Sequence, residues 1–245
     1  MIRIVIIMIA VVLFLVFSLP LLLVEWIIGK FNPGVKDRSS LAVVQWAFRV
    51  VLFMAGTKVT VIGKENLPTD RSVLYVCNHR SYFDIIINYS LMPGLTGFIS
   101  KKEMGKIPSF RLWMLNVKCL FLDRHDIKQG MQTILTAIDY IKSGISIFIF
   151  PEGTRNQTDD QTLLPFKGGS FKIATKSGCD IIPVSINNSE AVFESHFPRV
   201  IKSHVVVEYG KPIPVKDMSR DEIKALPEMV RGRIIDMYEK NKEAV

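Results

Sequence analysis

The chain has 245 residues, of which 49% are hydrophobic, and it carries a formal net charge of +8. This composition excludes a disordered chain, and the length suits one large α/β domain with a smaller appendage. The positive charge favours an anionic partner, which narrows the candidates to nucleic acid, an acidic membrane surface or a phosphorylated substrate.

The first predicted element is a long apolar helix. Residues 4–24 contain no charged side chain, and as a helix they would rise about 1.5 Å each, enough to cross a hydrocarbon core of roughly 30 Å. A cleaved signal peptide is the alternative, but the apolar run is longer than usual and no typical cleavage site follows it. Pro20 predicts a kink in this helix. The excess of lysine and arginine after it predicts a cytoplasmic downstream side.

A second apolar stretch covers residues 41–56, with Gln45 and Arg49 on one helical face. Because it is short for a membrane span, we expect an amphipathic helix in the interface or the second arm of a shallow hairpin. A buried helix of the soluble domain is the alternative. These features predict membrane-associated helices over residues 1–56 and an α/β domain over residues 57–245.

Strands and helices alternate in the rest of the chain. The patterns predict strands at 58–63, 72–78, 97–101, 119–124, 145–150, 179–187 and 203–213, and helices at 83–92, 108–116, 130–144, 171–178 and 219–244, the last with a break at Pro227. This alternation predicts an α/β fold, with a mixed, largely parallel sheet flanked by helices. The basic residues are dispersed rather than arranged in a stripe with aromatics, so nucleic-acid binding is not expected.

The segment NHRSYFD, residues 78–84, could carry chemistry. On one continuous helix His79 and Asp84 would lie about 140° apart. Ser81 suits an N-cap and Asp84 then takes the third helical position, as in a capping box, with His79 in the loop ahead. Either Asp84 merely caps the helix, or it accepts the Nδ1 proton of His79 and leaves Nε2 as a base. Spacing alone leaves both interpretations open.

The segment FPEGTR follows an apolar strand, at the edge where open α/β sheets bind ligands. It contains Glu152, Gly153, Thr154 and Arg155. Glycine permits close approach of the backbone, threonine offers a hydroxyl, and the planar fork of arginine suits phosphate. A simple turn with an internal Glu–Arg pair is the alternative.

Cations gather in a third segment, which contains Lys101, Lys102 and Lys106 and ends at Arg124 after the next strand. They would suit an anionic headgroup, although charge runs are usually solvated faces. The histidines have no metal-ligand spacing, and the three cysteines are far apart, which indicates buried, reduced thiols rather than a metal site: Cys77, Cys119 and Cys179.

Together these segments resemble the glycerolipid acyltransferase family, specifically the 1-acyl-sn-glycerol-3-phosphate acyltransferases. NHRSYFD is similar to the family's N-H-x-x-x-x-D block, and FPEGTR matches its most diagnostic block. LPFKGGSFKIA and IIPVSI resemble the segments that follow, so the resemblance covers roughly residues 58–210. The middle block departs, since Arg111 stands where the family commonly has glycine and residues 116–124 lack the usual glycine. These departures affect substrate preference more than chemistry.

The resemblance implies a glycerolphosphate-acyltransferase-like fold and a role for each motif. His79 would be the general base that takes the proton from the free hydroxyl of a lysophosphatidate, and Asp84 would orient it. The hydroxyl oxygen would attack the thioester of an acyl-CoA or acyl-carrier protein and yield phosphatidic acid. Arg155, Lys102 and Arg124 would hold the phosphate. Residues Glu152, Gly153 and Thr154 would shape that pocket.

The resemblance also implies the surroundings of the reaction. The acyl thioester is a co-substrate, and no metal or redox cofactor is needed. The expected partners are lysophosphatidate, the acyl donor and a phospholipid membrane, with the active domain at the cytoplasmic face of a bacterial inner membrane. The alternatives are an acyltransferase for glycerol 3-phosphate or another lysophospholipid, a thioester hydrolase in which His79 and Asp84 activate water, and a non-catalytic membrane lipid-binding protein.

Overall fold

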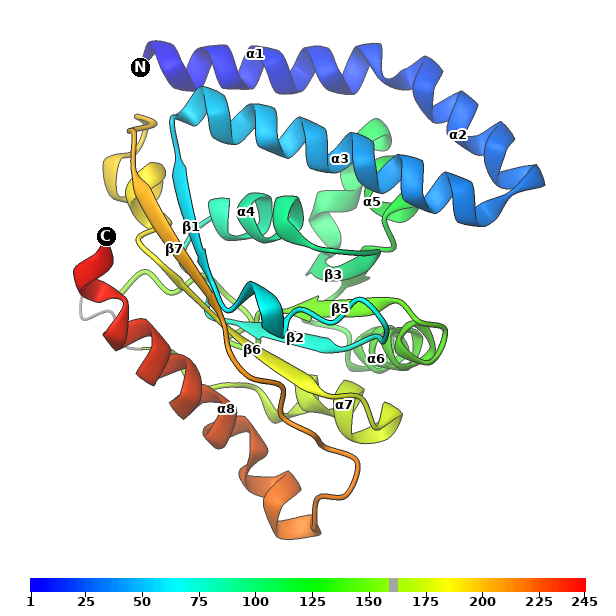
Figure 1. Ribbon diagram of the computed structural model, residues 1–245. Helices are drawn as coiled ribbons and strands as arrows, with labels where there is room; N and C mark the ends of the chain where they lie inside the picture. Colours follow the sequence, from blue (N-terminus) through cyan, green and yellow to red (C-terminus); the bar gives the residue numbers. More distant parts are fainter. Residues whose placement is uncertain (159–162) are drawn as a thin grey trace.

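Helices cover both faces of a seven-stranded sheet in the computed structural model, which describes residues 1–158 and 163–245 (Figure 1). The strand order is β1-β7-β6-β2-β5-β3-β4, and every neighbouring pair is parallel except β6 with β7. The prediction of a mixed, largely parallel sheet is therefore confirmed. The strands are β1 (Lys58–Ile62), β2 (Leu74–Cys77), β3 (Thr96–Lys101), β4 (Leu120–Leu122), β5 (Ser146–Ile149), β6 (Ile181–Asn187) and β7 (His204–Tyr209).

The helices divide between the two faces of the sheet (Figure 1). One face carries α3 (Pro33–Ala55), α4 (Phe83–Leu91) and α5 (Pro108–Asn116), and the other carries α6 (Ile127–Lys142), α7 (Lys172–Ser177) and α8 (Arg220–Lys240). Successive residues of β2 and β5 enter opposite cores because side chains alternate along a strand. Tyr75 and Phe148 lie in the core under α4, whereas Leu74 and Ile147 lie in the core under α6 and α8. This two-sided burial explains why these strands read as continuous apolar runs.

Two predicted element features differ from the structure. The helix predicted from residue 130 begins at Ile127, after the N-cap Asp126, whose side chain accepts a hydrogen bond from the Gln129 amide at 3.0 Å. The last helix continues through Pro227 without a break. Its start is well defined, because Ser219 and Glu222 form a reciprocal capping box.

The predicted kink in the N-terminal apolar stretch is present, and it divides the stretch into two helices. These are α1 (Ile2–Phe17) and α2 (Leu19–Phe31), bent by 46° at Ser18. Pro20 lies in the first turn of α2, where proline is tolerated because the amides there have no partner within the helix. The bend therefore precedes the proline, at a serine whose hydroxyl accepts a hydrogen bond from the Trp113 indole at 2.9 Å. By length and composition, α3 alone and α1 with α2 together could each cross a membrane.

The helix α3 is longer than its apolar stretch and is joined to the sheet domain by its polar face. The side chain of Gln45 donates hydrogen bonds to the carbonyls of Tyr89 at 3.2 Å and Met92 at 2.8 Å. Arg49 donates to the carbonyl of Ser90 at 3.3 Å. These carbonyls lie at or just beyond the end of α4, where the last carbonyls of a helix carry partial negative charge, and that of Tyr89 also accepts the Met92 amide at 3.4 Å. The division at residue 56 stays a prediction, because α3 packs on α4 and α5.

We predict that Gln45→Ala lowers the free energy of unfolding. The change removes the donor to the carbonyls of Tyr89 and Met92, and leaving the carbonyl of the buried Met92 without this partner costs about 1–3 kcal/mol. Thermal unfolding in a mild detergent measures the loss. The exposed Gln132 of α6 provides a control, since Gln132→Ala is expected to change stability by less than about 0.5 kcal/mol. Equal melting temperatures for both variants would contradict the prediction.

Candidate active site

The two principal motifs meet because β2 and β5 are parallel neighbours whose carboxyl ends lie side by side. The loop after β2 carries His79, and the loop after β5 carries Glu152. Backbone hydrogen bonds join the loops: the His79 amide donates to Glu152 Oε1 at 2.7 Å, and the Asn156 amide donates to the His79 carbonyl at 2.7 Å. The histidine is therefore held by the same loop that carries the predicted phosphate-binding residues.

His79 and Asp84 form a hydrogen-bonded pair, with 2.8 Å between Nδ1 of the ring and Oδ2 of the carboxylate. The imidazole ring also stacks on Phe150, with centroids 4.1 Å apart. Asp84 is fully buried, and its Oδ2 accepts two further hydrogen bonds, from the amides of Arg80 at 2.7 Å and Ser81 at 2.8 Å. The ring orientation is thus set on two sides, and Nε2 is the nitrogen left for a ligand.

The predicted capping box is wrong in its serine half. The N-cap of α4 is Tyr82, and the Ser81 hydroxyl bonds to the Phe83 amide at 2.9 Å rather than to the Asp84 amide. The Asp84 half exists, because its carboxylate accepts the Ser81 amide. The Ser81 hydroxyl also donates a hydrogen bond to Glu194 Oε2 at 2.6 Å. Asp84 therefore holds the helix start and the histidine at the same time.

Glu152 is buried, with 4% of its surface exposed, and both of its oxygens accept backbone hydrogen bonds. Besides the His79 amide, it accepts the Leu164 amide at 3.0 Å. Burial raises the pKa of the Glu152 carboxyl, and the two amides partly oppose this effect. Glu152 therefore supports the backbone of His79 and lies outside the wall of the cavity. Gly153, Thr154 and Arg155 do contribute to that wall.

Gly153 has a φ of +74°, and an added Cβ would lie 2.7 Å from Lys167 Nζ. A side chain at this position would be strained by the backbone conformation and would also displace the lysine. Lys167 itself lines the cavity and is tied to the motif by its amide, which donates to the Pro151 carbonyl at 3.0 Å. Lys167 thus adds a second cation beside the FPEGTR loop, one that the sequence did not single out.

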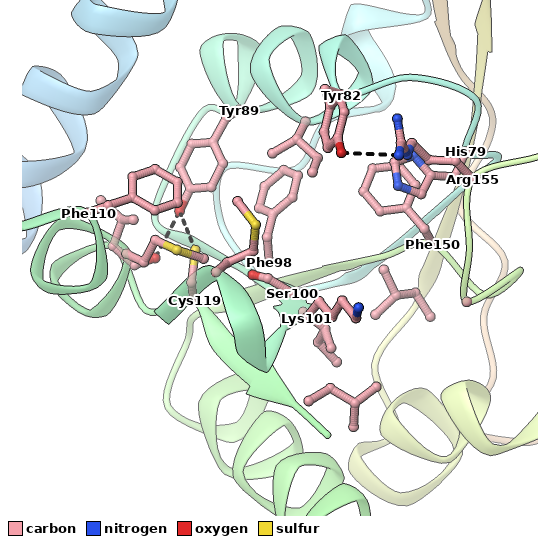
Figure 2. A pocket seen from close by; sticks show the side chains of 18 of the residues that line it. His79, Tyr82, Tyr89, Phe98, Ser100, Lys101, Phe110, Cys119, Phe150 and Arg155 are labelled. Carbon is pink, nitrogen blue, oxygen red and sulfur yellow. Dashed lines mark hydrogen bonds between the residues drawn. The ribbon is translucent and has the colours of Figure 1, made fainter. Parts of the chain in front are cut away.

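Arg155 is held by two residues from other segments, Glu194 and Tyr82, of which Figure 2 shows the second. Its Nη1 donates to Glu194 Oε1 at 3.2 Å, and its Nη2 donates to the Tyr82 hydroxyl at 3.1 Å. The guanidinium carbon lies 3.8 Å from the centroid of the Tyr82 ring. This cation–π contact orients the plane of the guanidinium at the edge of the cavity.

The remaining predicted cations are placed differently. Arg124 lines the cavity, together with Lys101 at the end of β3. Lys102 is outside this wall and pairs with Asp123 on the surface. That hydrogen bond lowers the pKa of the Asp123 carboxyl and raises that of Lys102. The structure therefore brings Lys101, rather than Lys102, to the side of the cavity near Arg124.

The cavity has a volume of about 470 Å³ and changes character along its length. His79 and Arg155 lie at its polar end, and Tyr89, Phe110 and Cys119 lie at its apolar end (Figure 2). The apolar wall comes largely from N-terminal helices and α5, through Phe14, Leu15, Val44, Ala47, Phe48, Trp113 and Met114. An elongated molecule with an anionic head and an apolar chain matches this division.

Sequence reasoning missed Tyr82, Glu194, Lys167 and the contribution of α1 and α3. Tyr82 lies inside NHRSYFD, and Lys167 lies inside LPFKGGSFKIA. The presence of an aromatic residue and a lysine in these two segments was therefore the signal that could have pointed to them. Glu194 gave no signal, because it is 39 residues from Arg155 and in a polar stretch of ordinary composition. Its position depends on the path of the chain after β6.

Comparisons with known proteins identify the family. A family model described as Acyltransferase matches residues 58–187, more than half of the chain. The chain belongs to the acyltransferase family. The NHRSYFD and FPEGTR segments of this acyltransferase lie within the matched residues, whereas Glu194 lies beyond them.

Individual relatives carry more specific names. The acyltransferase is 30% identical to a 1-acyl-sn-glycerol-3-phosphate acyltransferase of Salmonella typhimurium, over 70% of this chain and 69% of that protein. It is 29% identical to the protein of that name from Borreliella burgdorferi, over 82% of this chain and 80% of that protein. The Saccharomyces cerevisiae protein of that name is 28% identical over 77% of this chain, which spans 62% of the yeast protein.

A solved structure shares the fold. It is the crystal structure of the 1-acyl-sn-glycerophosphate acyltransferase of Thermotoga maritima, with a TM-score of 0.79 and 23% sequence identity. The match covers 98% of this chain and 95% of the other. The acyltransferase therefore has the predicted family fold over nearly its whole length, N-terminal helices included.

We predict that Glu152→Gln destabilises the protein. A glutamine offers one oxygen to two backbone amides, and an unpaired buried amide costs about 1–3 kcal/mol. Because burial raises the pKa of Glu152 above its ordinary 4.5, the folded state binds its proton more tightly than the unfolded chain. The contribution of this carboxyl to stability therefore falls as the pH rises above 4.5.

Thermal unfolding between pH 4.5 and pH 7 tests both parts of this prediction. The wild type is expected to be more stable than the variant, by a margin that narrows as the pH rises. The exposed Glu65 supplies the control, and Glu65→Gln is expected to follow the wild type throughout. A margin that widens with pH would show that Glu152 stabilises the fold chiefly as a carboxylate.

Proposed function

We propose that this protein transfers a fatty acyl group from an acyl thioester to the sn-2 hydroxyl of 1-acyl-glycerol 3-phosphate, making phosphatidic acid. One observation carries the proposal: an oriented histidine and an arginine lie at the polar end of a cavity whose other end is apolar. Family membership and the names of the relatives support the same reaction. The acyl thioester, as acyl-CoA or acyl-carrier protein, is the co-substrate, and the reaction requires no metal or redox cofactor.

The His79–Asp84 pair can perform the proton transfers. Nε2 of His79 takes the proton of the acceptor hydroxyl while its oxygen attacks the thioester carbonyl carbon. The carbon–sulfur bond then breaks, and the imidazolium returns the proton to the departing thiolate. Asp84, held at 2.8 Å from Nδ1, selects the tautomer of the neutral ring in which Nε2 is the acceptor, and it stabilises the imidazolium as it forms. Holding alcohol and thioester in one cavity adds the advantage of proximity.

Four cations around the polar end would bind the phosphate of the acceptor. Arg155 supplies a planar fork, and Lys101, Arg124 and Lys167 supply further positive charge on the wall of the cavity. Lys102 is engaged with Asp123 outside this wall, so we assign it no contact with the phosphate. Gly153 and Thr154 precede Arg155 in the chain and line the cavity beside it, so they would shape the phosphate pocket.

The apolar end would hold an acyl chain, and the helices that build it would also seat the protein on a membrane. Many large apolar side chains of α1 and α2 are exposed, including Ile2, Phe17, Leu23, Trp26 and Phe31. A phospholipid membrane is the natural cover for such a surface, and both lipid substrates partition into it. Lys30, Lys36 and Arg38 close to these helices favour the anionic cytoplasmic face of a bacterial inner membrane.

We expect purified protein to form phosphatidic acid from labelled acyl-CoA or acyl-carrier protein with lysophosphatidate, and not with glycerol 3-phosphate. His79→Ala should lower the rate by about 10²–10⁴-fold, because it removes the general base. His125→Ala is the matched control and should leave the rate unchanged, since His125 lies in an exposed loop after β4. Release of free fatty acid without an acceptor would instead indicate a hydrolase, and lipid binding without turnover would indicate a binding protein.

Arg155→Ala should mainly raise the KM for lysophosphatidate. Loss of a charge-assisted contact to phosphate costs about 1.5–3 kcal/mol, which corresponds to roughly a tenfold to hundredfold change. Steady-state kinetics with varied acceptor and saturating donor measure the effect. Arg220→Ala, at the exposed start of α8, is the control. An unchanged KM for Arg155→Ala would remove the phosphate-binding assignment.

A further inference from the structure

Glu194 lies outside the predicted motifs and yet contacts two of them. It belongs to a short 3-10 turn (Glu194–His196) between β6 and β7. Its Oε1 accepts the Tyr82 amide at 2.8 Å and Arg155 Nη1 at 3.2 Å, and its Oε2 accepts the Ser81 hydroxyl at 2.6 Å. The side chain is 14% exposed, so these charge-assisted contacts are partly shielded from water.

The contacts hold the guanidinium of Arg155 before any ligand arrives. Among the described residues, two of its five N–H groups have partners, Glu194 and Tyr82, and one face lies on the Tyr82 ring. The remaining donors are available to an anion at the cavity. A long side chain that is already ordered loses little further conformational freedom on binding, which favours affinity and fixes where the anion lies.

The same carboxylate holds the start of α4, whose first turn carries Asp84, the hydrogen-bond partner of His79. Glu194 binds Ser81 and the Tyr82 amide, and the adjoining Asp84 binds the Ser81 amide and His79 Nδ1. A continuous set of hydrogen bonds therefore runs from the arginine through Glu194 to the histidine. No other described carboxylate bonds to both Arg155 and the start of α4.

We infer that Glu194 is a positioning residue that sets the distance between the phosphate-binding arginine and the base, and so selects which hydroxyl is acylated. This inference rests on the proposed function. In 1-acyl-glycerol 3-phosphate the free hydroxyl is on the carbon next to the one that bears the phosphate ester. In the 2-acyl isomer the free hydroxyl is one carbon farther away. A fixed separation between Arg155 and His79 discriminates between these two positions.

Two ether analogues test the inference, because alkyl chains cannot migrate between the hydroxyls. The 1-O-alkyl-glycerol 3-phosphate has a free sn-2 hydroxyl, and the 2-O-alkyl-glycerol 3-phosphate has a free sn-1 hydroxyl. The wild type is expected to prefer the first. Glu194→Ala should raise the KM for the first analogue by about tenfold and reduce the preference by a similar factor, since small misplacements are costly in such reactions.

Glu194→Gln keeps the shape of the side chain and an acceptor oxygen while removing the charge, so it should restore much of the preference that Glu194→Ala loses. This partial rescue also keeps the test valid if the alanine variant folds poorly. Glu228→Ala removes an exposed carboxylate that pairs with Arg231, and it should leave the preference unchanged. Thermal unfolding of each variant accompanies the kinetics.

An unchanged KM and an unchanged preference in a folded Glu194→Ala protein would overturn the inference. A fall in kcat and melting temperature with the preference intact would also overturn it, because a merely structural role predicts that pattern. The proposed function fails separately, if the wild type acylates neither analogue.

Discussion

The hydrogen bond between Asp84 and His79 is the interaction on which the site depends. Asp84 is fully buried, and the same oxygen that binds the imidazole also accepts two amides at the start of α4. A buried carboxylate depends on hydrogen bonds, and Oδ2 accepts all three of these, whereas the buried Oδ1 has no hydrogen-bond partner among the described residues. The start of α4 and the imidazole of His79 therefore share one anion, so the geometry of the loop cannot change without disturbing the helix.

The rest of the polar site is arranged around this pair by the order of the strands. Because β2 and β5 are parallel neighbours, their loops meet, and Glu152 braces the backbone of His79 from behind. Arg155 then reaches the Tyr82 ring and Glu194 on the other side. His79 and Arg155 come from segments more than 70 residues apart, and the sheet brings them to one edge.

The N-terminal helices have two connected roles in the structure. Phe14 of α1 and Phe48 of α3 form part of the cavity wall, and the outer faces of α1 and α2 expose apolar side chains. Gln45 and Arg49 attach α3 to the end of α4, the helix whose first turn holds Asp84. The apolar appendage is thus joined by hydrogen bonds to the element that positions the base. The exposed apolar surface of α1 and α2 is therefore connected, through α3 and α4, to the His79–Asp84 pair.

The sequence by itself determined the alternation of strands and helices and the two polar motifs at strand ends, whereas the pairing of His79 with Asp84 was implied by the family resemblance and left open by spacing alone. These features depend on local periodicity and on spacings of a few residues, which a single chain displays directly. It also indicated the apolar N-terminus and a kink near Pro20, whereas the position of the bend at Ser18 depends on where the two helices begin and end.

The tertiary structure alone decided four other features: Lys101 rather than Lys102 on the cavity wall, Glu152 behind the loop, α1 and α3 as part of the wall, and Glu194 between the arginine and α4. The first depends on the exact residue at which β3 ends, which local patterns do not resolve. The others depend on packing between residues far apart in the chain. Such contacts arise from the path of the backbone, and no short pattern of residue types encodes them.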